Sequence, residues 1–145
     1  MPGNPQALAA SAAALVLLTS GVGARLLYCR VREMRAKRIH PQAAATSIQL
    51  AARLEDVRAS DNFRNLFEVP VLFYALVAIA LAVNHVPGWL VAGAWAFVAL
   101  RAVHSAIHCT YNRVMHRLAA FMCSFVLVVA LWGALMVSLY AHRAA

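Results

Sequence analysis

The chain alternates four long apolar stretches with short polar segments. The apolar stretches cover about residues 6–29, 62–83, 89–111 and 117–140. Each is long enough for a helix that crosses the hydrocarbon core of a bilayer, which is about 30 Å thick. The pattern therefore predicts an all-α fold, an integral membrane four-helix bundle that forms one membrane domain over residues 1–145.

The longest polar segment lies between the first two apolar stretches, at residues 30–61. His40-Pro41 is expected to stop any extension of the first helix, because proline disfavours helix in the residue before it. Pro70 lies inside the second apolar stretch and predicts a kink there. Residues 46–58 predict a short amphipathic helix, with apolar positions at Ile48, Leu50, Leu54 and Val57.

Composition and charge agree with a membrane protein. Hydrophobic residues make up 63% of the 145 residues and charged residues 12%, whereas soluble domains are about half apolar and a quarter charged. A net charge of +8 would suit nucleic acid. The basic residues lie between apolar stretches, however, where they are typical membrane anchors, so no nucleic-acid partner is expected. Cys29, Cys109 and Cys123 lack metal-type spacing and are expected to be small buried residues.

The distribution of lysine and arginine predicts the orientation in the membrane. From Arg30 to Arg64, both included, the chain has eight basic residues. Arg113 and Arg117 lie at the junction of the last two apolar stretches. The turn at residues 84–88 has neither lysine nor arginine. Since basic loops stay in the cytoplasm, both termini are expected outside and residues 30–61 in the cytoplasm.

Polar residues inside the apolar stretches carry the candidate chemistry. Arg101, His104, His108 and Tyr111 are spaced three, four and three apart, so a helix places them on one stripe. Arg101 would lie roughly 15 Å deeper than Tyr111, too deep for its charge to reach the surface. Glu68 is the one carboxylate expected within the membrane, so an ion pair between Glu68 and Arg101 is predicted.

Each of these features also has a purely structural interpretation. The Glu68–Arg101 pair could simply fix the register of two helices. His104 and His108 are four apart, as in some metal sites, but no third ligand is evident. They are therefore expected to be hydrogen-bonded pocket residues, and no metal is predicted.

A cationic pocket is predicted at the cytoplasmic end. Arg113 and Arg117 are four apart, and they would join Arg30, Arg64 and Asn65 there. Arginines bind carboxylates with two hydrogen bonds, and an arginine next to a thiol favours the thiolate. This arrangement suits a small polyanion, although membrane anchoring would account for some of the arginines.

The combined motifs resemble a known family. Residues 64–68 read RNLFE, Arg101 and His104 lie three apart, and Arg117 follows Arg101 by sixteen residues. This combination resembles the membrane-associated proteins in eicosanoid and glutathione metabolism (MAPEG). That family includes microsomal glutathione transferases, leukotriene synthase and microsomal prostaglandin E synthase. The resemblance covers about residues 10–140, and residues 101–117 are most similar to the bacterial branch.

The resemblance implies a homotrimer in the bacterial inner membrane, with glutathione as co-substrate between subunits near the cytoplasmic face. Arg117 would be catalytic, stabilising the glutathione thiolate for attack on a hydrophobic second substrate or a lipid hydroperoxide. Glu68 would also brace Arg101. Residues implied to bind glutathione or support its site are Arg30 (with Arg32 in reserve), Arg64, Asn65, Glu68, Arg101, His104, His108 and Arg113.

Three positions depart from the eukaryotic members, and other functions stay open. His108 and Phe121 replace tyrosines, and Asp61 replaces an arginine. A non-catalytic trimeric membrane protein, whose cationic interface binds a lipid head group or another small anion, is the main alternative. A channel or transporter fits less well, because residues 89–100 form an apolar run without a polar stripe.

Overall fold

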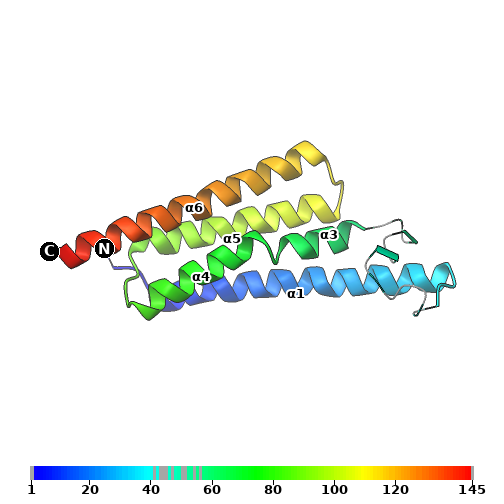
Figure 1. The fold of residues 1–145 in the computed structure, drawn as a ribbon, viewed down its shortest axis with the longest axis horizontal. Coiled ribbons are helices and arrows are strands. Elements are labelled where there is room, and N and C mark those ends of the chain that lie inside the picture. Colours follow the sequence, from blue (N-terminus) through cyan, green and yellow to red (C-terminus); the bar gives the residue numbers. More distant parts are fainter. Residues whose placement is uncertain are drawn as a thin grey trace.

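The computed structural model describes residues 2–40, 42, 46, 48–49, 52–53, 55 and 57–144. Within them the chain is built from helices packed side by side along one long axis (Figure 1). Four segments are long and apolar enough to cross a membrane, which confirms the predicted helical membrane fold. The helices are α1 (Pro5–Ala36), α3 (Arg58–Asn65), α4 (Val69–Ala82), α5 (Gly88–Cys109) and α6 (Val114–Ala144).

The first helix begins at a clear capping signal and runs further than the apolar stretch. The Asn4 side-chain oxygen accepts hydrogen bonds from the amides of Gln6 and Ala7, at 2.8 and 3.4 Å. Pro5 follows the cap, where a missing amide hydrogen costs nothing. Helix α1 ends at Ala36, ahead of the His40-Pro41 stop. The amphipathic helix expected over residues 46–58 includes positions 50 and 54, which lie outside the described residues.

The second membrane segment is interrupted. It spans Arg58–Ala82 but consists of two helices, α3 and α4, separated by residues 66–68. Pro70 lies at the start of α4, where a proline is tolerated because the first amides of a helix need no partner within it. The kink predicted from Pro70 is confirmed, and the helix breaks just before the proline. Glu68 lies in this break and is exposed.

The ends of the bundle differ in polarity (Figure 1). Both termini and the α4–α5 turn lie at one end, and the end of α1, the start of α3 and the α5–α6 turn lie at the other. The second end therefore gathers the basic segments identified in the sequence. This arrangement is the one that the positive-inside pattern requires, while the side of the membrane that each end faces stays a prediction.

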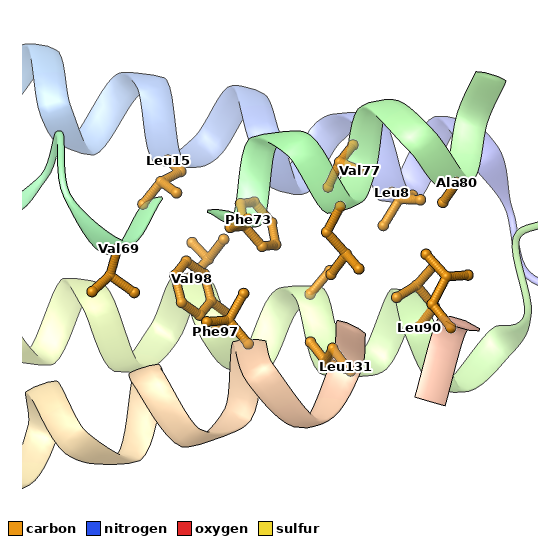
Figure 2. Close-up of a cluster of buried hydrophobic side chains, with 14 residues drawn as sticks. Leu8, Leu15, Val69, Phe73, Val77, Ala80, Leu90, Phe97, Val98 and Leu131 are labelled. Atoms are coloured by element: carbon orange, nitrogen blue, oxygen red, sulfur yellow. The ribbon is translucent and has the colours of Figure 1, made fainter. Parts of the chain in front are cut away.

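An apolar core holds the half of the bundle near the termini. Phe73 of α4 stacks on Phe97 of α5, with ring centroids 4.6 Å apart. Figure 2 shows Leu131 of α6 beside Phe97 and Leu8 of α1 beside Ala80 of α4. Large apolar side chains are also exposed on the outer helix faces, among them Leu17, Val71, Val126 and Val137. Such surfaces are normal for helices that face lipid or a neighbouring subunit.

Candidate functional site

The second half of α5 buries the polar stripe predicted from the sequence. Arg101, His104 and His108 have 0%, 1% and 1% of their surface exposed. Their spacing of three and four places them on one face of α5, towards α3 and α6. Tyr111 does not belong to this face, because α5 ends at Cys109 and the tyrosine is exposed beside His116.

Arg101 does not make the contact that the sequence predicted. Its Nη2 donates to the backbone carbonyl of Asn65 at 3.0 Å, and its guanidinium carbon lies 5.8 Å from the centre of the Phe121 ring. Its Nε and Nη1 are buried without a hydrogen-bond partner in the described part of the chain. No ion pair joins Arg101 to Glu68 within these residues, so that prediction is wrong for the single chain.

The interruption of the second segment explains why the ion pair is absent. In a continuous helix Asn65 and Glu68 would share one face. Here α3 ends at Asn65, and Glu68 has φ −96° and ψ −90°, outside the helical region. The carboxylate is therefore exposed. The backbone carbonyl of Asn65, which also accepts from the Glu68 amide at 3.4 Å, takes its place as the acceptor.

Arg117 joins α6 to the end of α5. Its Nη1 donates to the Asn112 side-chain oxygen at 2.9 Å and lies 3.3 Å from His108 Nε2. A guanidinium can only donate, so His108 Nε2 must accept and the neutral ring carries its hydrogen on Nδ1. The family resemblance implied that Arg117 and His108 belong to one site, and the structure brings them into contact.

The backbone of Arg117 orients His104. The His104 Nδ1 lies 3.2 Å from the carbonyl oxygen of Arg117. A carbonyl only accepts, so Nδ1 carries the hydrogen, and in the neutral ring Nε2 has a free lone pair. This Nε2 is buried and has no partner in the described residues. His104 therefore offers an acceptor that the protein itself leaves unused.

A small cavity lies against these groups. It has a volume of about 210 Å³. Polar groups from three helices meet apolar side chains of α6 in its wall. The lining residues are Asn65, His104, Val114, Arg117, Leu118 and Phe121.

Four predicted site residues lie away from this cavity in the single chain. Arg64 and Arg113 are exposed near the basic end of the bundle, and Glu68 is exposed in the break between α3 and α4. Arg30 is half-buried on α1, and its Nε is buried without a partner within the described residues. The structure thus brings together Asn65, Arg101, His104, His108 and Arg117, and it does not bring the other four to them.

The sequence interpretation missed the groups that fix the end of α5. Arg25 of α1 donates to the Cys109 carbonyl at 2.7 Å, and Arg58 of α3 donates to the Thr110 carbonyl at 2.6 Å. Cations next to the last carbonyls of a helix also interact favourably with the negative end of the helix dipole. Asn112 was missed as well, and its one signal was an asparagine directly after a predicted helix. These three residues hold the turn that leads to Arg117.

A second polar cluster lies inside the bundle between α3 and α5. The amide nitrogen of Asn62 lies 3.3 Å from Cys109 Sγ, and Ser105 donates to the Asn62 side-chain oxygen at 3.3 Å. All three side chains are buried. Their groups satisfy one another, so this cluster joins two helices. Among the described residues no group of three or more histidine, cysteine or acidic side chains could hold a metal ion.

Comparison with known proteins identifies the family. No curated protein and no solved structure matches the chain. A sequence model of the MAPEG family matches residues 8–137, a range that overlaps all four membrane-spanning segments and contains every residue of the cavity wall. The match and the four apolar helices together make this a multi-pass membrane protein, and the chain belongs to the MAPEG family.

Proposed function

We propose that the protein is a membrane-bound glutathione-dependent transferase or peroxidase. The family to which it belongs includes glutathione transferases and peroxidases. The observation that carries the proposal is the position of Arg117. Its guanidinium lines a cavity, and the side chains that orient it, His108 and Asn112, are both uncharged in the tautomers that the hydrogen bonds require.

A guanidinium in this position supplies the step that the reaction needs. Ordinary thiols have a pKa near 8.5, and an adjacent cation lowers it, so the thiolate forms at neutral pH and its proton passes to water. The sulfur lone pair then forms a bond to an electrophilic carbon while the leaving group departs with its electron pair. With a lipid hydroperoxide, the thiolate attacks the outer oxygen, the O–O bond breaks, and the departing alkoxide takes a proton from water to give the alcohol. A second glutathione reduces the resulting sulfenic acid to the disulfide and water.

The remaining polar groups suit the rest of glutathione, which has two carboxylates, an ammonium and two peptide bonds. The free acceptor of His104 suits a peptide N–H of the ligand. Glu68 suits the ammonium, and the Asn65 amide suits a peptide group. The carboxylates are assigned to the exposed arginines at the basic end, Arg64 and Arg113, together with Arg30.

The size of the cavity supports a site that more than one subunit completes. Its volume of about 210 Å³ is below the roughly 300 Å³ typical of small-molecule sites. Several residues that we propose to bind glutathione are exposed in the single chain. A homotrimer that brings a neighbouring surface to this cavity would enclose the ligand. We place the assembly in the bacterial inner membrane with the basic end in the cytoplasm, following the positive-inside rule.

The test is conjugation of glutathione to a hydrophobic aryl chloride by purified protein in detergent. Arg117→Ala should lower kcat/KM by about 100-fold or more, comparable to losing a key electrostatic group in other enzymes. The matched control is Arg35→Ala, which removes an exposed arginine of α1 and should leave the rate unchanged. The oligomer size of both variants should equal that of the wild type by light scattering.

Two results would reject the proposal. The first is an absence of glutathione binding to the wild type by calorimetry in detergent. This result would favour the alternative of a non-catalytic protein that binds an anionic head group at this end. The second is an unchanged conjugation rate for Arg117→Ala, which would show that Arg117 does not stabilise the thiolate.

A further inference from the structure

Asn112 connects the turn between α5 and α6 to the candidate catalytic arginine. Its backbone has φ 47°, in the left-handed region, and its amide donates to the Ile107 carbonyl at 2.9 Å. Asparagine tolerates this conformation better than most residues. The backbone of Asn112 is therefore held by the end of α5, and its side chain is left to bind Arg117.

The donors of Arg117 can be counted. A guanidinium has five N–H groups, two on Nη1, two on Nη2 and one on Nε. Nη1 is used by Asn112 and His108, at 2.9 and 3.3 Å. Within the described residues, Nη2 and Nε make no hydrogen bond, so three donors of a cavity-lining side chain stay available. Both acceptors on Nη1 are neutral, so neither cancels the charge of the guanidinium.

We propose that Asn112 is a positioning residue for Arg117. It anchors Nη1 to the end of α5, so that Nε and Nη2 can meet the sulfur of a bound thiol with an uncancelled positive charge. The inference rests on the proposed function, because it concerns the same site. A carboxylate in place of the asparagine amide would hold the same nitrogen but would neutralise much of its field.

A second asparagine shows that turn formation alone does not account for this contact. Asn84, just after the end of α4, also has a left-handed backbone, with φ 52°. The neighbouring amide of His85 donates to the Ala80 carbonyl at 3.0 Å, which closes that helix. Among the described residues the Asn84 side chain makes no hydrogen bond. A left-handed asparagine can thus end a helix in this protein without using its side chain.

The experiment measures the pH at which bound glutathione becomes a thiolate, from its ultraviolet absorbance, in the full-length protein in detergent. Asn112→Gly keeps a left-handed backbone accessible and removes only the acceptor. We expect roughly fivefold less thiolate at a given pH below the midpoint, in keeping with the loss of one hydrogen bond to a charged group. Asn84→Gly makes the same change at the opposite end of the bundle and should leave the midpoint unchanged.

A second variant separates positioning from turn formation. Asn112→Asp also tolerates the left-handed backbone and keeps an oxygen acceptor. If Asn112 only shapes the turn, this variant should behave as the wild type. If its neutral side chain positions Arg117, the added carboxylate should reduce the thiolate population roughly tenfold or more.

The outcomes distinguish this inference from the proposed function. If the wild type binds glutathione and forms the thiolate, but Asn112→Gly has the same midpoint, the positioning role is overturned and the proposed function stands. Wild-type behaviour of Asn112→Asp would overturn the role as well. If the wild type binds no glutathione, the proposed function itself fails, and the role of Asn112 fails with it.

Discussion

The first half of α5 packs as an ordinary apolar core, whereas the second half buries a guanidinium and two imidazoles. Leu90, Ala94 and Phe97 are fully buried among apolar side chains of the neighbouring helices. Arg101, His104 and His108 are buried to the same degree further along the same helix. One helix thus carries two environments of equal burial and opposite chemistry.

The two halves of α5 differ in how many of their buried side-chain groups find suitable partners within the protein. An apolar side chain needs only close packing, and stacked Phe73 and Phe97 achieve it. Buried polar nitrogens need partners, and in the described residues several at the basic end lack one. These are Nε of Arg30, Nε and Nη1 of Arg101, Nε2 of His104 and Nδ1 of His108. Leaving such groups unpaired is costly, so the second half of α5 contributes less to stability than the first, as the proposed glutathione site would lead us to expect.

Phe97→Ala should produce the largest effect on stability. The loss of its packing against Phe73 should lower the free energy of unfolding by about 3–5 kcal/mol, while glutathione affinity of the folded protein stays unchanged. Denaturant titration in detergent and calorimetry would measure the two quantities. The matched control is Val126→Ala, at a position that is 59% exposed, which should cost little. A large loss of affinity in folded Phe97→Ala protein would show that the two halves are coupled.

Arg101→Met should have the opposite pattern. Replacing a buried cation by an apolar side chain of similar length should leave stability unchanged or raise it by about 1–2 kcal/mol. Glutathione affinity should fall roughly tenfold, since a positive charge next to the cavity is lost. Denaturant titration in detergent would measure the stability, and calorimetry would measure the affinity. Destabilisation as large as that of Phe97→Ala would mean that Arg101 serves the fold.

Gly93→Ala should have a moderate effect that is confined to the apolar half. A Cβ at this position would collide with the side chain of Leu131, which is 6% exposed and has little room to move. We expect a loss of about 1–3 kcal/mol, as for other overpacked cores. Gly133→Ala on α6 is the control, because a Cβ there meets nothing within 4 Å. Equal unfolding midpoints for the two variants would contradict close α5–α6 packing at Gly93.

Lys37→Met should have the smallest effect. The pKa of Lys37 is raised because its ammonium donates to Glu33 and Glu55, at 2.8 and 2.9 Å. A raised pKa means that these ion pairs persist at neutral pH and are lost only as the pH rises above roughly 10.5. Because the group is exposed, limited proteolysis between residues 38 and 57 should accelerate only two- to threefold or so. Arg38→Met should not change the rate, and equal rates for both variants would reject this contact.

Several site residues could be predicted from the sequence because their placement depends on helical period alone. The spacing of Arg101, His104 and His108 places them on one face of any helix, and membrane burial requires that face to turn inward. The choice of acceptor for Arg101 could not be predicted in the same way. It depends on a break at residues 66–68, which moves Glu68 off the face of Asn65.

By itself the sequence determined the four membrane-spanning segments, the kink near Pro70 and the collection of basic residues at one end. All of these follow from local hydrophobicity, helical period and charge. Only the tertiary structure decided which groups meet. The contact of Arg117 with Asn112 and His108, and the tautomers of both histidines, require the end of α5 and the start of α6 to approach across a turn. Side-chain hydrogen bonds of this kind depend on distances of a few tenths of an ångström, which the packing of α5 on α6 sets and the pattern of residues does not.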